Sequence, residues 1–338
     1  MTSLGQSLNP TAVRQILAES APARVRSLYD LQELLARTYR KLRNDPGETV
    51  ATVMDELAGG IADMRANTGA DGWKAAVEKI RRHPLTAVLH EDPFTHRGFH
   101  KPWGHAGDAL MLDLIYHGQS GEASAEGATP LGARIQSYTT TAPIAQAILN
   151  RRDILALQID HAAQRCGGAE VLALQSGHLR EAERSAAVRN HALHRFIALD
   201  RDIHAVATVE KEWGRAGVSA INTPTYALLN GAANALGRFD LIYSAGLFDE
   251  LDVRAGVRAM AAMFAMLKPR GVIWIANFLP GIRDAAYLEA FMNWWLVYRT
   301  TAALEGLLAD VPDSAIANRR IYVEPTDQVA FLEVTRSA

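Results

Sequence analysis

Apolar residues recur at helical spacing through the first part of the chain. One stripe is Val13, Ile16 and Leu17, a second is Leu28, Leu31, Leu34 and Leu35, and a third is Val53, Leu57, Ile61 and Met64. Residues three or four apart lie on the same face of a helix, so each stripe predicts a helix that buries one side. We therefore expect helices over residues 10–82, in an N-terminal all-helical cap.

The pattern changes after Ala169, where short apolar runs alternate with helix-forming segments. A long helix over 143–165, ended by two glycines, is expected just before the change. The runs predict strands at Val171–Leu174, Phe196–Leu199, Val218–Ile221, Phe239–Ser244 and Gly271–Phe278. The segments between and after them predict helices near Arg180–Leu193, Asp202–Trp213, Tyr226–Leu236, Val253–Leu267 and Asp284–Leu308. Such alternation predicts a mostly parallel sheet with right-handed crossovers.

The end of the chain departs from this alternation. Arg320–Glu324 and Val329–Val334 flank a turn at Pro325–Asp327 and alternate like a β-hairpin with one exposed strand. A nicotinamide dehydrogenase would more often continue the strand–helix alternation. We expect an α/β fold, with a Rossmann-like domain and terminal β-hairpin over residues 131–338 and the helical cap over residues 1–130.

Composition narrows the class of protein. A formal charge of −2 over 338 residues argues against a nucleic-acid partner bound through a phosphate-neutralising surface. The single cysteine, Cys166, excludes an internal disulfide and a cysteine-cluster metal site. No metal is expected, because no His/Asp pair has a convincing ligand spacing. We expect a cytoplasmic protein without a membrane partner, because no basic-then-apolar leader and no long apolar window is visible.

Polar residues follow the first two predicted strands. The first strand ends in Gln175-Ser176-Gly177 and the second ends in Asp200. Strand, glycine turn, helix, strand and acid is how doubly wound folds build a nucleotide pocket, with backbone N–H groups at a helix N-terminus and an acid for ribose hydroxyls. Only one of the usual two or three glycines is present, so a turn that binds nothing stays an equal alternative on this evidence.

Several further motifs occur in a fixed order. They are Lys101-Pro-Trp-Gly-His-Ala-Gly-Asp108 with Tyr116, Phe239-Asp-Leu-Ile-Tyr-Ser-Ala-Gly-Leu-Phe-Asp249, Ala276-Asn-Phe278 and Asn293-Trp-Trp-Leu-Val-Tyr-Arg299. With five parallel strands and a terminal hairpin, they resemble the class I S-adenosylmethionine (SAM) dependent methyltransferases. Within that class they resemble the bacterial enzymes of 3-hydroxypalmitic acid methyl ester biosynthesis. The resemblance extends from about Asp92 to the C-terminus and does not include the first ninety residues.

This resemblance implies SAM as the cofactor and places its contacts by motif position. Gln175, Ser176 and Gly177 would hold the methionine part, and Asp200 with Arg201 would hold the ribose. The other implied positions are Asn222 and Thr223 at the adenine, Ser244, Ala245 and Gly246 beside the sulfonium, and Arg152 at a carboxylate. The corresponding residue types stand at these positions in the sequence.

Methyl transfer needs an in-line approach and desolvation, and a poor nucleophile also needs a general base. By motif the base candidates are His105, Asp108 and His178, although His178 is expected more often to be a helix-start residue. Aromatic side chains are expected to surround the sulfonium, which cation–π contact favours. The candidate catalytic residues are His105, Asp108, Tyr116, Asn277 and Tyr298, with Trp103, Tyr138, Trp294 and Arg299 as further candidates around them.

The sequence departs from the methyltransferase pattern at three places. The first-strand loop lacks an acidic residue and a second glycine, His105 stands where Tyr is common, and Asn293 stands where Asp is expected. Three functions therefore stay open. The first is methyl transfer from SAM to a small acceptor in secondary or signalling metabolism. The second is cyclisation of SAM to azetidine-2-carboxylate with release of methylthioadenosine, as in synthases of the same fold, and the third is SAM binding without catalysis. A small-molecule substrate is expected in the first case, and the oligomeric state is not indicated.

Overall fold

The computed structural model describes residues 25–44, 49–118, 128–224, 227 and 235–338. By compactness the chain divides into two units, Met1–Val88 and Leu89–Ala338. Residues 89–130, which we expected to belong to the helical cap, group with the sheet in this division. Each unit is described by itself.

The described residues of the first unit are mainly helical. Its helices are α2 (Leu28–Asn44), α3 (Val50–Asn67) and α4 (Ala70–Arg82), and α5 (Leu85–Leu89) begins at its end. The predicted stripes on α2 and α3 are buried, except that Leu28 at the start of α2 is 37% exposed. The Thr49 hydroxyl accepts a hydrogen bond from the Thr52 N–H and so caps α3. The stripe of Val13, Ile16 and Leu17 lies outside the described residues.

The second unit contains a seven-stranded sheet in the order β3-β2-β1-β4-β5-β7-β6. The strands are β1 (Glu170–Leu174), β2 (Arg195–Asp200), β3 (Val218–Asn222), β4 (Phe239–Ser244), β5 (Leu267–Phe278), β6 (Ile316–Val323) and β7 (Val329–Arg336). The first five run parallel, whereas β7 pairs antiparallel with both β5 and β6. The predicted strands and terminal hairpin are confirmed, and the fold is α/β and Rossmann-like, preceded by a helical region.

This strand order has a switch point between β1 and β4. The chain proceeds outward from β1 to β2 and β3, and then returns to place β4 on the other side of β1. Loops that leave β1 and β4 therefore diverge, which opens a crevice at their carboxyl ends. Ligands of open α/β sheets bind in such crevices.

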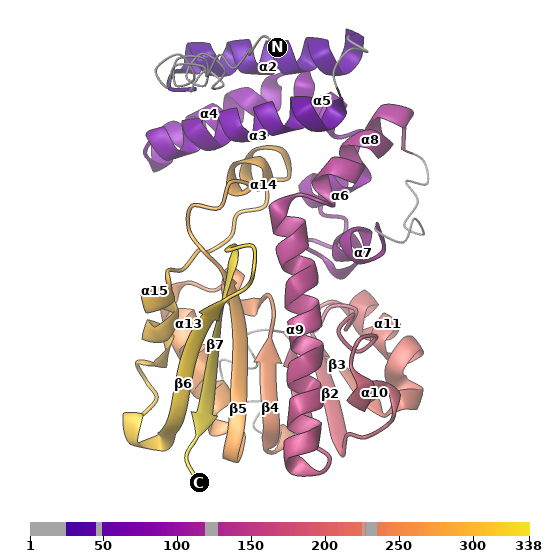
Figure 1. The fold of residues 1–338 in the computed structure, drawn as a ribbon, viewed down its shortest axis with the longest axis vertical. Helices are drawn as coiled ribbons and strands as arrows, with labels where there is room; N and C mark the ends of the chain where they lie inside the picture. Colours follow the sequence, from indigo (N-terminus) through magenta and orange to yellow (C-terminus); the bar gives the residue numbers. More distant parts are fainter. Residues whose placement is uncertain (1–24, 45–48, 119–127, 225–226, 228–234) are drawn as a thin grey trace, which may run out of the picture. The chain divides into compact units, whose positions relative to one another are not determined.

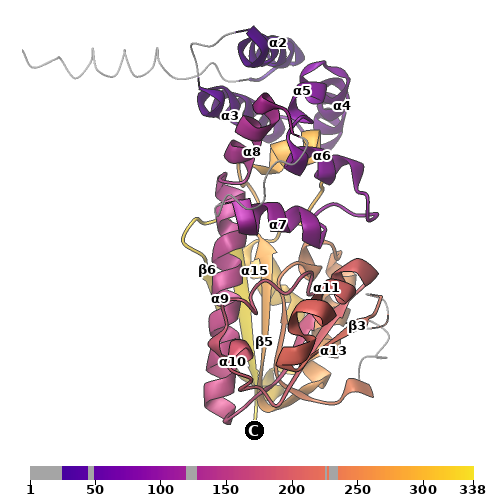
Figure 2. The ribbon, with the colours of Figure 1, turned by 90° about the vertical axis from the view of Figure 1, so that its right-hand side faces the viewer.

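The helices of the second unit flank the sheet and its carboxyl edge. They are α6 (Pro93–His100), α7 (Ala109–Gly118), α8 (Pro130–Thr139), α9 (Pro143–Cys166), α10 (Ala186–Arg189), α11 (Ile203–Trp213), α13 (Val253–Ala265), α14 (Ala285–Phe291) and α15 (Thr301–Glu305). Helix α9 is the predicted long helix, and it ends where Gly167 takes a left-handed conformation. It lies along one face of the sheet, and α13 lies on the opposite face (Figures 1 and 2).

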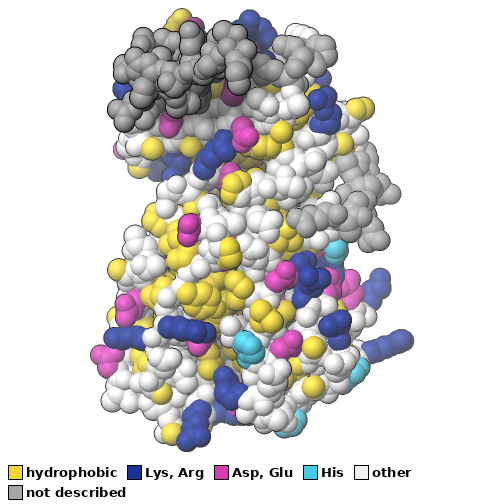
Figure 3. All heavy atoms as spheres, in the orientation of Figure 1, with side chains coloured by type: hydrophobic (Ala, Val, Ile, Leu, Met, Phe, Trp, Pro, Cys, Tyr) yellow, Lys and Arg dark blue, Asp and Glu magenta, His cyan; other side chains and the backbone are white. Residues whose placement is uncertain are grey.

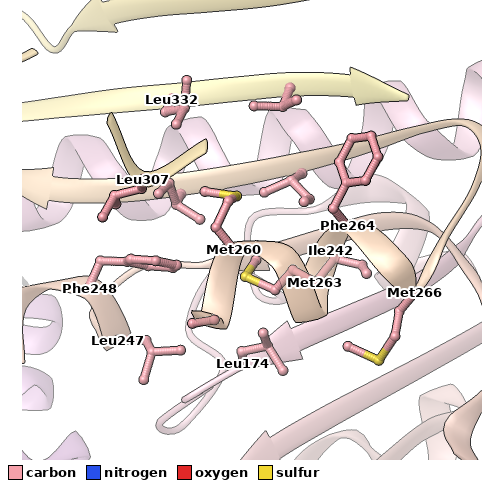
Figure 4. Packing of buried hydrophobic residues seen from close by; sticks show 14 of the residues in the cluster. Leu174, Ile242, Leu247, Phe248, Met260, Met263, Phe264, Met266, Leu307 and Leu332 are labelled. Carbon is pink, nitrogen blue, oxygen red and sulfur yellow. The ribbon is translucent and has the colours of Figure 1, made fainter. Parts of the chain in front are cut away.

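A core fills the space between α13 and the sheet. Met260, Met263 and Phe264 of α13 pack on strand residues such as Ile242 and Leu332, together with Leu307 (Figure 4). Burying each of these side chains contributes about 1.5–3 kcal/mol relative to exposure. The loops that carry polar groups at the strand ends are thus attached to a tightly packed frame.

Two predicted helices are wrong. Residues 180–185 form turns, and only Ala186–Arg189 is helical before β2. Leu179 has a positive φ, which breaks a helix at its start. The second is the helix over Asp284–Leu308, which is interrupted between α14 and α15, where Asn293 is also left-handed. The predicted helix at Tyr226–Leu236 lies largely outside the described residues.

Basic and acidic side chains are interspersed on the face drawn in Figure 3, with no broad basic area. Among the described helices, none combines the length and the apolar character that crossing a membrane requires.

Candidate functional site

A pocket lies at the carboxyl ends of β1, β2 and β4. Helix α7 lies beside this edge of the sheet (Figures 1 and 2). The pocket is lined by the loops that follow these strands, by the loop before α7 and one side of that helix, by the middle of α9 and by the start of α11. Of the residues predicted from the sequence, it contains His105, Tyr116, Arg152, Gln175, Ser176, Gly177, Asp200, Ala245 and Gly246. The pocket is therefore at the switch point, where the strand order favours a ligand.

The loop after β1 forms the base of this pocket. Gln175, Gly177 and Leu179 all have positive φ, so the backbone takes a left-handed conformation at every second residue. The Ser176 N–H donates to the Leu199 carbonyl of β2 (3.1 Å), which ties the loop to the neighbouring strand. The expected helix N-terminus behind the glycine is absent, because turns continue to Ser185. The loop consequently offers individual N–H groups and side chains and no helix dipole.

Asp200, at the end of β2, is buried against this loop with 5% of its surface exposed. Its Oδ2 accepts a hydrogen bond from the Gly177 N–H (2.8 Å), and its Oδ1 accepts one from the Asp202 N–H (2.8 Å). Burial raises the pKa of Asp200, while these two N–H groups oppose the rise. An ionised carboxylate has about four acceptor positions. Two are occupied by these N–H groups, so two are left on a residue that lines the pocket.

A smaller hollow continues the pocket beyond Asp200, with Gln175, Arg201 and Thr223 in its wall. Both Gln175 and Arg201 donate hydrogen bonds to Glu250 (2.8 and 2.9 Å), which follows β4. The Gln175 Oε1 is buried and has no hydrogen-bond partner among the described residues. A buried acceptor without a partner costs about 1–3 kcal/mol, so this atom favours a ligand that donates a hydrogen bond.

Two arginines of α9 form the basic side of the pocket. Arg151 is buried, donates to the Ala245 carbonyl (2.7 Å) and lies 3.7 Å from Asp249. Arg152 pairs with Asp153 (2.9 Å) and lies over the ring of Tyr116, 5.4 Å from its centroid. Guanidinium groups in a partly dry pocket attract a carboxylate.

Some of the predicted residues have structural tasks instead. Asp108 caps α7 by accepting from the Met111 N–H (2.8 Å), and it pairs with Arg97 (2.8 Å). Ser244 donates to the Leu174 carbonyl, and Asn222 donates to the carbonyls of Asp200 and Arg201. These bonds hold the strand ends together, so the three side chains support the pocket without lining its main cavity.

A second group of predicted residues lies away from the pocket walls. Asn277 uses its whole amide in a buried network, accepting from Arg299 and donating to Asp249 and to the Val297 carbonyl. Arg299 also donates to the Phe248 and Leu251 carbonyls, so its charge is held in the interior. Neither residue lines the main pocket or either of the two hollows beside it. The side chains of Tyr138, Trp294 and Tyr298 do not line them either. Trp294 packs instead on Gly107, where an added Cβ would lie 2.6 Å from the ring.

His178 was a base candidate from the sequence, which did not indicate its partner, Asp113. Asp113 of α7 lies 2.8 Å from Nδ1 of His178, although the two residues are 65 positions apart. Asp113 was detectable only as a charged residue within the apolar segment Ala109-Leu-Met-Leu-Asp-Leu-Ile115. Glu181, also in the pocket wall, is buried and accepts a 2.6 Å hydrogen bond from Tyr243. Burial raises the pKa of Glu181.

The described residues contain no group of three or more His, Cys, Asp or Glu side chains arranged to hold a metal ion. His105, in contrast to His178, has its Nδ1 beside a backbone carbonyl, that of Trp103 at 3.2 Å. It lines the main pocket and also an open hollow that includes Trp103 and His204.

Comparison with known proteins gives a likeness in fold. No family model matches the chain, and no curated protein matches it. The solved structure of a possible exported protein from Bordetella parapertussis is 15% identical, with a TM-score of 0.50, and the match covers 98% of this chain and 100% of that one. At this identity the likeness shows the fold alone.

Over a little more than half of its length, the chain is also similar to SAM-dependent methyltransferases. N-methyltransferase NodS from Bradyrhizobium japonicum WM9 is 16% identical, with a TM-score of 0.39, over 56% of this chain and 97% of that chain. Magnesium protoporphyrin IX methyltransferase from Synechocystis PCC 6803, solved with bound SAM, is 11% identical, with a TM-score of 0.40. The match covers 57% of this chain and 84% of that chain.

Proposed function

We propose that this chain binds SAM in the pocket at the switch point and transfers its methyl group to a small acceptor. The observation that supports this most directly is Asp200, a buried carboxylate at the end of β2 that lines the pocket and has acceptor positions left over. Paired hydroxyl groups of a ribose match such a carboxylate. Because Asp200 also fixes the Gly177 N–H, its position is set before any ligand arrives.

The other parts of SAM would fit the remaining walls. Gln175 Oε1 needs a donor, which SAM offers in its amino groups and hydroxyls. Arg151 and Arg152 would balance the charge of the methionine carboxylate. Tyr116 is a pocket residue whose ring is suited to contact with a sulfonium. When bound, SAM supplies an electrophilic methyl group, and the chain supplies orientation and exclusion of water.

The acceptor would approach from the side of α7. Leu112 and Tyr116 of this helix, with Leu155 of α9, give that wall an apolar character. Such a wall suits a small molecule with an apolar or aromatic body. We propose these placements of the acceptor and of the parts of SAM together with a role in secondary or signalling metabolism.

Calorimetric titration with SAM and with S-adenosylhomocysteine tests the binding site. Asp200→Ala removes the acceptor for the ribose hydroxyls, and Asp200→Asn keeps one oxygen for the Gly177 N–H. The loss of one or two charge-assisted hydrogen bonds predicts a Kd about 10- to 100-fold weaker. Asp310→Asn, a change at an exposed carboxylate, is the control that should leave the Kd unchanged. Equal affinity in wild type and in both Asp200 variants would refute the pocket assignment.

Incubation of the wild-type protein with SAM distinguishes the three functions. Formation of S-adenosylhomocysteine only after an acceptor is added supports methyl transfer. Methylthioadenosine and azetidine-2-carboxylate from SAM alone would instead indicate cyclisation, and binding without any product would indicate a non-catalytic SAM-binding protein. Mass spectrometry of the products separates these outcomes.

A further inference from the structure

His178 is held at the pocket wall by a carboxylate on another element. Its Nδ1 lies 2.8 Å from Oδ2 of Asp113, which α7 carries to this position. The histidine is 5% exposed, and its Nε2 is buried with no hydrogen-bond partner among the described residues. His178 and Asp113 both line the main pocket. One nitrogen is therefore fixed, and the other, on a residue that lines the pocket, has its hydrogen-bonding capacity unused.

The charge on Asp113 determines which nitrogen carries the hydrogen. Burial alone would raise the pKa of Asp113, but hydrogen bonds from Arg180 and His178 outweigh it and lower the pKa. Arg180 binds both oxygens of Asp113, at 2.7 Å each. An ionised carboxylate only accepts hydrogen bonds, so Nδ1 of neutral His178 must carry the hydrogen. The lone pair is then on Nε2.

Further contacts fix the ring and set its electrostatic surroundings. The ring of Trp103 meets that of His178 edge-on, with centroids 6.2 Å apart. Trp103 is stacked on His204 of α11 at 5.0 Å and lies under the guanidinium of Arg97 of α6 at 4.7 Å. Arg180 is itself balanced by Glu183 and Glu212. The other titratable groups in the pocket wall are His105, Tyr116, Arg151, Arg152, Glu181, Asp200, Asp202 and Tyr243.

A purely structural histidine would be expected to use both ring nitrogens. A buried imidazole nitrogen without a partner costs free energy, whereas a second hydrogen bond within the fold would recover it. A carboxylate on Nδ1 instead stabilises the imidazolium that forms when Nε2 takes up a proton. His105 lacks such a carboxylate, because its Nδ1 lies beside a backbone carbonyl.

We propose that His178, oriented by Asp113, is the general base that deprotonates the acceptor of methyl transfer, and that this acceptor is a small molecule with a reacting hydroxyl or ammonium group. The proposal rests on the proposed function of the pocket. The reacting oxygen or nitrogen forms its bond to the methyl carbon as the sulfur–carbon bond breaks, and sulfur keeps that electron pair. The proton of the acceptor moves to Nε2 of His178. The resulting imidazolium is paired with the Asp113 carboxylate and later releases the proton to water.

The class of acceptor follows from the chemistry of the base. A thiol is already partly ionised at neutral pH and needs little help, whereas a hydroxyl or ammonium group keeps its proton and needs a base. A positioned base contributes about 10²- to 10⁴-fold to rate. Both oxygens of Asp113 are bound by Arg180, and one of them also by His178. Asp113 therefore acts on the acceptor through His178 and is a positioning residue.

The experiment uses the full chain with SAM and measures S-adenosylhomocysteine formed with phenol, catechol, ethanolamine and 2-mercaptoethanol. His178→Gln should lower kcat with the hydroxyl or amine probes by about 10²- to 10⁴-fold and keep its Kd for SAM within about threefold. Turnover of the thiol, where it occurs, should change far less. His161→Gln, a change at an exposed histidine of α9, is the matched control with unchanged kcat.

The pH profile separates a base from a structural role. Wild-type kcat should fall toward acid as His178 becomes protonated, and this acid limb should be missing in His178→Gln. Asp113→Asn should keep part of the activity and move the acid limb to lower pH, because the imidazolium loses its counter-charge. Circular dichroism of each variant checks that the fold persists.

Two results would overturn the inference and leave SAM binding intact. One is a His178→Gln variant that keeps wild-type kcat and its acid limb with a hydroxyl or amine probe. The other is a wild-type protein that binds SAM and methylates the thiol but none of the hydroxyl or amine probes. Failure of the proposed function looks different, because wild type would then either not bind SAM or bind it without forming S-adenosylhomocysteine from any probe.

Discussion

The buried carboxyl group of Asp249 should make the stability of this protein fall as the pH rises. Asp249 follows β4 and is 3% exposed. Its Oδ1 accepts from the Asn277 side chain (2.8 Å) and the Phe278 N–H (2.9 Å), and its Oδ2 lies 3.7 Å from Arg151. Burial raises the pKa of Asp249 to about 7, although the charge of Arg151 opposes the rise.

The sign and size of the effect follow from linkage. The folded-state pKa lies above the unfolded value, so the folded protein binds this proton more tightly. The contribution to stability is complete below about pH 4 and is lost as the pH rises through about 7. Since one pKa unit corresponds to about 1.4 kcal/mol, Asp249 alone should lower the free energy of unfolding by about 3 kcal/mol between about pH 5 and pH 8.

The comparison is between wild type and Asp249→Asn, in which the amide oxygen still accepts from Asn277 and Phe278 but nothing titrates. Reversible urea unfolding across this pH range gives the free energy of each protein, and their difference isolates Asp249. Exposed Asp310→Asn is the control, with a difference that does not vary with pH. A constant difference for Asp249→Asn as well would refute the reasoning, because it would mean that the buried carboxyl is ionised throughout.

Two predictions concern packing. An added Cβ at Gly132 would lie 2.1 Å from the Glu91 carbonyl oxygen, so Gly132→Ala should lower the free energy of unfolding by about 1–3 kcal/mol. At Gly72 in α4 there is room for the added methyl group, so Gly72→Ala should raise the free energy of unfolding by up to about 1 kcal/mol. Thermal unfolding of both variants checks the opposite signs, and equal signs would contradict the prediction. Trp274→Phe removes a 2.7 Å hydrogen bond to Tyr322 and part of a buried ring, so chemical denaturation should show a loss of about 1–3 kcal/mol. A loss below about 0.5 kcal/mol would show that the site repacks.

The sheet was predictable because its signals are local. Each strand is a short apolar run, as in Val171–Leu174, and the hairpin shows alternation around Pro325–Asp327. Helix α11 was likewise marked by its cap, since the Asp202 side chain accepts from the His204 N–H. In these segments the propensity of the chain and its tertiary contacts favour the same structure.

The wrong helices lie where tertiary contacts override local preference. Arg180 and Glu181 are good helix formers, but their side chains are bound to Asp113 and Tyr243, and the chain follows those contacts. After α14, the Val297 and Arg299 N–H groups donate to the carbonyls of Asp249 and Phe278 instead of to a helix turn. A single sequence gives no sign of such distant partners.

The same limit applies to the candidate site. Gln175, Gly177 and Asp200 could be placed at the pocket from the sequence because they end or closely follow strands, and strand ends meet at one edge of a sheet. Asp108, Asn277 and Arg299 were chosen from motifs, and the structure gives them caps and buried networks instead. The pairing of Asp113 with His178 depends on where α7 lies, which periodicity alone does not determine.

The terminal hairpin has a consequence for solubility during folding and storage. Strand β6 is an outer strand of the sheet, and such an unpaired edge is a template onto which another chain can add. Four consecutive residues, 317–320, are exposed there, and two of them are Arg319 and Arg320. Both arginines are paired with acidic groups, Arg319 with Glu305 and Arg320 with Glu333. These charges would have to be stripped of water and partners before a strand could dock, so β6 protects the sheet against edge-to-edge aggregation.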